Sequence, residues 1–214
     1  MKGDTPMKVI AINGSPKANG NTYTALTLVG EELQKESIEF EIIHIGNKLI
    51  RGCMACGSCA KTLNEQCIVN DEVNACLQKL KAADGILLGT PVHYSGIAGT
   101  MKSFLDRLFY VAGANGGMFR HKVGASVVAV RRSGGVPTFD ALNHYINYAE
   151  MILPGSNYWN VIHGREPGEV LKDHEGNQIM RVLGKNMAWL LKLVEAGKAQ
   201  APPREDKIVT NFVR

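Results

Sequence analysis

Four cysteines are close enough in the sequence to act together on one metal centre. Cys53, Cys56, Cys59 and Cys67 follow the spacing C-x2-C-x2-C-x7-C. Thiolates are soft ligands, and this spacing lets all four converge on one soft metal centre. Free thiols are the alternative, because spacing alone does not assign a metal. All five cysteines lie between positions 53 and 76, and an odd, clustered set indicates a reducing, cytoplasmic compartment rather than a disulfide framework.

A polar segment with two glycines follows the first apolar run of the chain. Residues 8–13 predict a strand and residues from about 21 predict a helix, so the segment between them joins a strand to a helix. A helix N-terminus binds anions through its free N–H groups and its dipole, and phosphate is the natural ligand. Ser15, Asn21 and Thr22 can add donors, and Lys17 a charge. An ordinary polar turn with a capping threonine is the alternative.

The pattern of this segment also argues against two common nucleotide motifs. It matches neither G-x-G-x-x-G nor G-x-x-x-x-G-K-[ST], because no lysine precedes Thr22 and the second glycine is displaced. A Rossmann dinucleotide site and an ATP-hydrolysing site are therefore disfavoured.

A second loop, residues 90–96 (TPVHYSG), also follows an apolar strand-like run and precedes a helical pattern. If the sheet is parallel, this loop lies at the same edge as the first. An aromatic side chain among small and polar residues can lie along a flat heterocycle while backbone N–H groups bond its edge. A purely structural turn is the alternative.

The remaining elements alternate between strands and helices. Strands are predicted at 40–45, 85–90, 123–130 and 158–162, and helical faces at 73–80, 101–108, 137–151 and 178–196. Asp71 is the expected N-cap of the 73–80 helix, whose apolar face includes Cys76 as a buried core thiol. Near-continuous apolar strands between helices predict a parallel sheet covered on both faces.

Length and charge limit the remaining choices. A chain of 214 residues with 45% hydrophobic composition predicts one domain. The net charge of +4 is dispersed, which disfavours nucleic-acid binding, and no apolar stretch approaches the ~20 residues that span a bilayer. We therefore expect a domain over 1–198 with a cysteine-rich loop at 51–70. The tail, 199–214, is expected to be mobile or to pack on a partner subunit.

Three segments together resemble the NADPH-dependent FMN reductase family of flavodoxin-like proteins. They are GSPKANGNT, GTPVHYSGIAGTMKSFLDR and RRSGG at 131–135, in that order. The resemblance covers about residues 8–196. It implies a doubly wound, five-stranded parallel sheet of order 2-1-3-4-5, with helices on both faces. Lys17 stands where many members of the family carry arginine, which keeps the charge but loses the bidentate fork.

The same resemblance implies an FMN site built from three loops. The FMN phosphate is expected at Ser15, Pro16, Lys17, Asn19, Gly20, Asn21 and Thr22. The ribityl chain and the ring are expected at Pro91, Val92, His93, Tyr94, Ser95 and Gly96, with Ser133, Gly134 and Gly135 closing over the ring. No side chain is assigned as a catalytic acid or base, and His93 and Tyr94 are the nearest candidates for tuning the flavin.

The cysteine spacing resembles the compact motif of the iron–sulfur flavoproteins, a branch of the same family. That resemblance implies a [4Fe-4S] cluster held by Cys53, Cys56, Cys59 and Cys67. A structural zinc site and free thiols stay open as alternatives.

The resemblance leads to two main hypotheses of function. The first is an oxidoreductase that passes electrons from NADPH or NADH through FMN to a small acceptor such as a quinone or a flavin. The second is an electron carrier that exchanges electrons with ferredoxin and uses no nicotinamide. A flavin or metal sensor is least favoured. A homodimer or homotetramer is implied by the family.

Two further groups of residues have simpler interpretations. Tyr158 and Trp159 fall in the predicted last strand, where packing in the core is the favoured role over lining a neighbouring subunit's flavin site. The segment 164–176, with His163, His174, Asp173 and Glu175, could suggest a metal site, but the spacing of these residues fits no strong ligand pattern. We expect a solvated loop there.

Overall fold

A sheet of parallel strands runs through the centre of the protein. The computed structural model describes residues 6–212. Its parallel strands are β1 (Lys8–Asn13), β2 (Glu39–His44), β3 (Gly85–His93), β5 (Val123–Val130) and β6 (Val161–His163). Every residue of β5 is buried, as expected for a strand covered on both faces. The order β2-β1-β3-β5-β6 confirms the predicted 2-1-3-4-5 order of the parallel strands.

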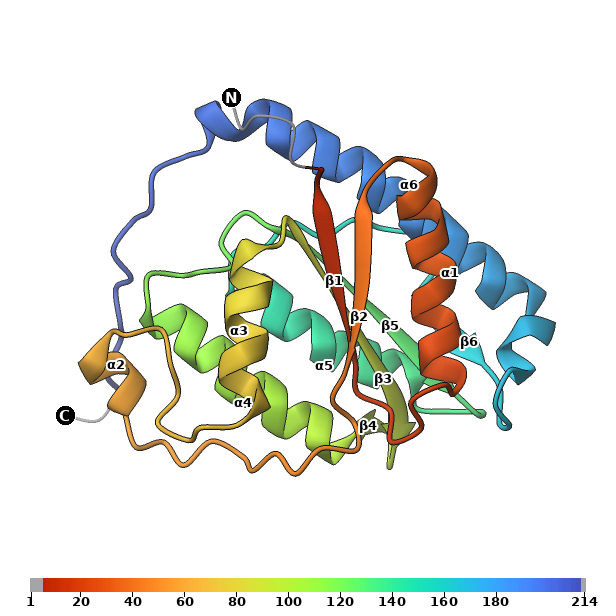
Figure 1. The fold of residues 1–214 in the computed structure, drawn as a ribbon, viewed down its shortest axis with the longest axis horizontal. Helices are drawn as coiled ribbons and strands as arrows, with labels where there is room; N and C mark the ends of the chain where they lie inside the picture. Colours follow the sequence, from red (N-terminus) through yellow and green to blue (C-terminus); the bar gives the residue numbers. More distant parts are fainter. Residues whose placement is uncertain (1–5, 213–214) are drawn as a thin grey trace.

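Five longer helices cover the two faces of this sheet. They are α1 (Asn21–Lys35), α3 (Glu72–Ala82), α4 (Gly99–Ala114), α5 (Gly135–Tyr148) and α6 (His174–Gly197). Successive β1 residues point to opposite faces. Val9 and Ala11 pack with α1 and α6, whereas Ile10 and Ile12 pack with α3, α4 and α5. Figure 1 shows these two helical layers on either side of the strands.

Several short elements connect the main ones. They are α2 (Ser58–Thr62), β4 (Gly96–Ile97), and two 3-10 turns, η1 (Glu169–Lys172) and η2 (Lys198–Gln200). Strand β4 pairs antiparallel with the end of β3. It is a sixth strand, which the sequence did not predict.

Two helix caps show how polar residues set the ends of elements. The Asp71 side chain accepts a hydrogen bond from the Val73 amide at 3.1 Å, which confirms the predicted N-cap of α3. Asp173 accepts a bond from the Gly176 amide at 2.9 Å, so α6 begins at His174, four residues before the predicted start at 178.

The prediction for the last strand is partly wrong. Strand β6 begins at Val161, and the aromatic pair before it lies outside the sheet. Tyr158 is 58% exposed and Trp159 47% exposed, with their rings edge-to-face at 4.4 Å between centroids. The rings shield each other instead of entering the core, so the predicted core role is wrong. Cys76, in contrast, is 6% exposed and is confirmed as a core thiol.

The C-terminal segment returns along the outside of the molecule (Figure 1). Residues 201–212 form no helix or strand. The Arg120 guanidinium donates to the carbonyl oxygens of Pro202 and Pro203, and the Lys207 ammonium donates to the Tyr148 hydroxyl at 2.8 Å. Residues 1–5 of the predicted domain and 213–214 of the predicted tail lie outside the described residues. Within 6–212, no helix is long and apolar enough to cross a membrane.

Candidate functional site

Three loops follow the carboxyl ends of neighbouring parallel strands. The first loop is residues 14–20 after β1, the hairpin turn is residues 93–96 at the end of β3, and the third loop is residues 131–134 after β5. From β1 the chain first adds β2 on one side and then β3 on the other, so the strand order changes direction between β1 and β3. Ligands of open α/β sheets bind outside the strand ends at such a switch point. The topology therefore places the predicted site residues at one edge.

The first loop is shaped by a buried asparagine at the end of β1. Asn13 is fully buried; its Oδ1 accepts from the Ser15 amide at 3.0 Å and its Nδ2 donates to the Ala18 carbonyl at 2.9 Å. The Lys17 amide donates to the Ser15 hydroxyl at 3.2 Å. These bonds curl the loop into the start of α1. No role was predicted for Asn13, although a polar residue that ends an apolar strand is a recognisable signal.

Helix α1 begins at this loop with an unpaired polar atom. Gly20 is its N-cap and supplies no side-chain cap, so the first N–H groups of the helix have no intrahelical acceptor. Thr22 is 1% exposed, and its hydroxyl oxygen is buried without a hydrogen-bond partner among the described residues. A buried hydroxyl without a partner is costly, so it marks a place for a missing acceptor. An anion at the helix N-terminus supplies one.

The first loop is also held from its outer side. The imidazole of His44, at the end of β2, donates from Nε2 to the Ser15 carbonyl oxygen at 2.7 Å. Gly46 lies against the same carbonyl, and a Cβ there would stand 2.1 Å from the Ser15 oxygen. The loop backbone therefore depends on two residues that the sequence analysis did not select.

Asn21 has a contact that was not predicted for it. Its Oδ1 accepts a hydrogen bond from the Gly168 amide at 2.9 Å, which ties the start of α1 to the segment between β6 and η1. This bond gives the side-chain oxygen of Asn21 a structural role at the loop.

The second loop forms a tight hairpin between β3 and β4. Tyr94 and Ser95 are its two central residues, with positive φ angles of 49° and 58°, as in a type I′ turn. Neither residue is glycine or asparagine, so each carries backbone strain of about 1 kcal/mol. The Tyr94 side chain is fully exposed and His93 is exposed beside it. A strained turn that presents an aromatic ring to solvent suits contact with a ligand.

The third loop packs directly on this hairpin. Gly134 has a φ of +85°, and a Cβ built on it would stand 2.8 Å from the Ser95 Cα and 3.0 Å from Val92 Cγ1. Its carbonyl accepts from the Thr138 hydroxyl at 2.7 Å, which closes the first turn of α5. The structure thus brings the second and third loops together. The Gly14 amide donates to the Gly89 carbonyl oxygen at 2.8 Å, so the first loop leaves the sheet beside β3, the strand that leads to the hairpin.

The four cysteines of the predicted metal site line one small cavity. Its volume is about 20 Å³, and Cys53, Cys56, Cys59 and Cys67 all border it. Cys53 and Cys56 are exposed, Cys67 is half-buried and Cys59 is buried. Burial raises the pKa of the Cys59 thiol; the Ala60 amide opposes this shift, and the Cys67 and Cys56 thiols add to it. The four thiols are therefore neighbours, although they lie on a long segment between β2 and α3.

The thiols are not arranged around a single metal ion. No group of three His, Cys, Asp or Glu side chains within residues 6–212 has the geometry to hold one. Four thiolates on one zinc, each at about 2.3 Å, must lie within about 4 Å of one another. In a four-iron cluster each thiolate binds a different iron, so the ligands stand farther apart. Four cysteine thiols around one cavity are the donor set that such a cluster takes.

A buried arginine holds this cysteine segment in place. Arg107 of α4 is 1% exposed and pairs with both carboxylate oxygens of Asp71, at 2.5 and 2.9 Å. It also donates to the Val69 carbonyl oxygen, and its Nε donates to the Cys67 sulfur at 3.4 Å. Asn74 accepts from the Cys67 amide at 2.8 Å. No contact was predicted for Arg107, because its partners lie 36 or more positions away in the sequence.

The predicted solvated loop at 163–175 borders a shallow cavity of about 450 Å³. Burial opposes ionisation of Asp173, but hydrogen bonds from the Gly176 and His163 amides outweigh it and lower the pKa of this carboxyl. The His163 ring faces Asp173 at 3.3 Å. These contacts stabilise the start of α6.

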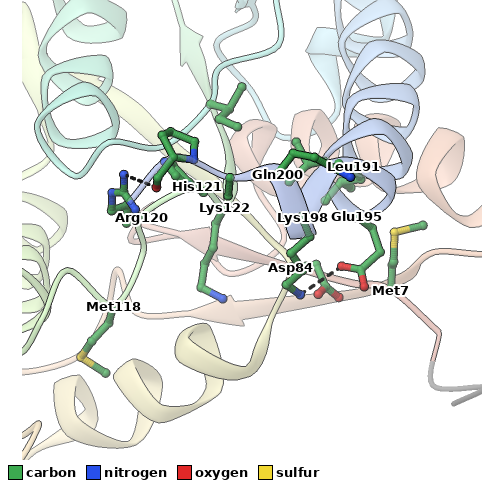
Figure 2. A pocket seen from close by; sticks show the side chains of 15 residues that line it. Met7, Asp84, Met118, Arg120, His121, Lys122, Leu191, Glu195, Lys198 and Gln200 are labelled. Atoms are coloured by element: carbon green, nitrogen blue, oxygen red, sulfur yellow. Dashed lines mark hydrogen bonds and ion pairs between the residues drawn. The ribbon is translucent and has the colours of Figure 1, made fainter. Parts of the chain in front are cut away.

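A larger cavity, about 510 Å³, lies at the opposite edge of the sheet (Figure 2). Met7, Asp84 and Lys122 border it, and each directly precedes a strand. Leu191, Glu195 and Lys198 of the C-terminal region also line it, as Figure 2 shows. This cavity is at the amino ends of the strands, away from all three loops, and is separate from the candidate site.

Comparison with known proteins agrees with this arrangement of fold and loops. Residues 7–166 match the family model described as NADPH-dependent FMN reductase. The chain belongs to this family. As a member of the NADPH-dependent FMN reductase family, it is an FMN-dependent, flavodoxin-like oxidoreductase, and the predicted family is confirmed.

Curated relatives of this FMN reductase family member include iron-sulfur flavoproteins. One from Methanocaldococcus jannaschii is 33% identical over 196 residues, covering 88% of this chain and 100% of the relative. One from Archaeoglobus fulgidus is 31% identical over 206 residues, covering 93% of this chain and 100% of the relative. The names of these relatives match the predicted branch.

Solved structures place this family member among flavodoxin-like folds. RosB, whose crystal structure holds 8-demethyl-8-formylriboflavin-5'-phosphate, has a TM-score of 0.69 at 15% identity over 97% of this chain and 92% of that one. An archaeal flavodoxin has a TM-score of 0.57 at 17% identity over 87% of this chain and 99% of that one. At these identities the likeness shows the fold alone.

Proposed function

We propose that this protein transfers electrons from NADPH or NADH, through FMN, to a small acceptor such as a quinone or a flavin. The unpaired Thr22 hydroxyl at the N-terminus of α1 carries the proposal, because it marks a site for an anion at the switch point of the sheet. Bound FMN supplies the redox chemistry, since its ring accepts two electrons and passes them on.

In this proposal the first loop holds the FMN phosphate. Thr22 donates its hydroxyl, the N-terminal amides of α1 point at the phosphate oxygens, and Lys17 adds charge. Asn13 and His44 keep the loop backbone in its curled shape. The remaining proposed phosphate residues are Ser15, Pro16, Asn19, Gly20 and Asn21.

The hairpin and the third loop hold the flavin ring. Tyr94 lies along the ring and His93 beside it, while the backbone of the third loop closes from the other side. The remaining proposed contacts are Pro91, Val92, Ser95, Gly96, Ser133, Gly134 and Gly135. The contact of Gly134 with Ser95 supports this, because it holds the two loops together without a ligand.

We further propose a [4Fe-4S] cluster at Cys53, Cys56, Cys59 and Cys67. The shared cavity and the iron-sulfur flavoprotein relatives support it. Such a cluster supplies one-electron exchange with a partner. An electron carrier that works with ferredoxin and without nicotinamide is therefore the second candidate function.

One anaerobic experiment separates the two candidates. The oxidised protein is mixed in turn with NADPH, NADH and reduced ferredoxin, and the flavin absorbance is followed. Rapid bleaching by a nicotinamide supports the reductase. Bleaching by ferredoxin alone supports the carrier and rejects the leading proposal.

The cellular location of the protein is proposed from its cysteines. The clustered free thiols support a cytoplasmic location, where thiols stay reduced.

We propose a homodimer or homotetramer, for which the exposed Tyr158 and Trp159 rings are candidate contacts. Light scattering that gives the mass of a single chain would reject this assembly.

A further inference from the structure

The buried guanidinium of Arg107 joins the two ends of the cysteine segment. Its Nη1 donates to the Arg51 carbonyl oxygen at 3.4 Å, and its Nη2 donates to the Val69 carbonyl oxygen at 3.0 Å. The pair with Asp71 adds two further bonds next to Val69. Residues 51 and 69–71 flank all four cysteines, so one side chain fixes the base of the segment.

These bonds do not explain why a charged group is placed here. The neighbours of Arg107 on α4, Phe104, Leu105 and Leu108, are fully buried core residues. A buried ion pair contributes little net stability compared with apolar packing of similar volume. Stability alone therefore does not account for a guanidinium at this position, and its charge points to a further role.

The remaining donor of this guanidinium is directed at sulfur. Arg107 Nε donates to the Cys67 Sγ at 3.4 Å, from a side chain that is 1% exposed. A charged donor in a buried setting interacts more strongly than the same donor in water, because solvent screens it less. Any added negative charge on the sulfur strengthens this bond.

We propose that Arg107 tunes the redox potential of the centre held by the four cysteines; this rests on the proposed cluster. When the centre gains one electron from a reductant, its negative charge increases by one, partly on the cysteine sulfurs. The Arg107 donor stabilises that added charge and raises the potential. Asp71, paired with the same guanidinium, offsets part of its charge and lowers the potential.

Two substitutions of opposite electrostatic effect test this inference. Arg107→Gln removes the charge but keeps a long polar side chain. Asp71→Asn keeps the cap of α3, since asparagine is an equally good N-cap, and leaves the guanidinium less compensated. Lys102→Met is the matched control. It also removes a positive charge from α4, but the ion-pair partner of Lys102 is Asp106 and not Asp71.

The proteins are purified without oxygen and titrated with dithionite. Electron paramagnetic resonance follows the reduced cluster, and absorbance follows the flavin. Arg107→Gln is expected to lower the equilibrium constant for cluster reduction roughly tenfold, which is about 59 mV for one electron. Asp71→Asn is expected to raise the cluster potential. The cluster potential of Lys102→Met is expected to equal that of the wild type. The flavin potential is expected to stay unchanged in all three variants.

Other outcomes overturn the inference in distinguishable ways. An Arg107→Gln protein with full iron content and an unchanged cluster potential would show that Arg107 only holds the segment. If Arg107→Gln loses its iron, Asp71→Asn decides: a raised potential supports tuning, and an unchanged one rejects it. Wild-type protein that binds FMN but no iron would reject the proposed cluster, and this inference with it.

Discussion

Replacing Thr22 with valine tests the candidate phosphate site with almost no change of shape. Valine and threonine are both β-branched, so the start of α1 keeps its packing and its helix propensity. The Thr22 hydroxyl is buried without a partner among the described residues. Leaving such a group unpaired costs about 1–3 kcal/mol. In the FMN-free protein, valine removes this cost, so the free energy of unfolding is expected to stay equal or to rise.

The same substitution is expected to weaken FMN binding. A hydrogen bond to a charged group contributes about 1.5–3 kcal/mol, which corresponds to a roughly 10–150-fold increase in Kd. Riboflavin lacks the phosphate, so its affinity is expected to be the same for both proteins. The assay is quenching of flavin fluorescence on titration of the apoprotein with FMN or riboflavin. Urea unfolding of the apoproteins supplies the stability comparison.

Two results would refute this reasoning. An unchanged Kd for FMN would show that the Thr22 hydroxyl does not bond the phosphate. An equal loss of riboflavin and FMN affinity would show that the substitution disturbs the loop as a whole. Thr27→Val is the matched control, because that hydroxyl donates to a backbone carbonyl on the exposed side of the same helix.

Three further predictions test the loops and the buried thiol. Gly46→Ala would place a Cβ 2.1 Å from a first-loop carbonyl oxygen, so we expect FMN affinity to fall at least tenfold, whereas Gly155→Ala, with open space around it, is expected to leave it unchanged. Gly134→Ala and Gly116→Ala share a positive φ that costs about 1 kcal/mol, but only the former meets the hairpin backbone at 2.8 Å, so only it is expected to weaken flavin binding in the same titration. Burial raises the pKa of Cys76 to about 11, so little thiolate forms at pH 8, and iodoacetamide with mass spectrometry is expected to label it only after unfolding; labelling of the folded protein would contradict its place in the core.

The fold was predictable because its signals are local. Each parallel strand except β2 is a short apolar run. Along the helices, apolar residues recur every three or four positions and form the face that packs on the sheet. The family resemblance then supplied the strand order, which periodicity alone does not give. Asp71 was recognisable as a cap because its position before an apolar helical face is itself a local pattern.

Some features escaped prediction because their local signal is unusual, and one because its contacts join distant residues. Strand β4 was missed because Tyr94 and Ser95 lack the glycine or asparagine that usually marks such a turn. Trp159 was assigned to the core because it falls in the predicted last strand, whereas its ring packs on Tyr158 before β6 begins. Arg107 was unassigned because its partners lie in another part of the chain.

The absorption spectrum of protein purified without oxygen tests the central claim most directly. The account predicts two resolved flavin bands on a broad shoulder that bleaches with dithionite, from FMN and an iron–sulfur cluster together. Flavin bands without the shoulder would reject the cluster but keep the FMN oxidoreductase. A colourless protein that also fails to bind added FMN would contradict the account as a whole.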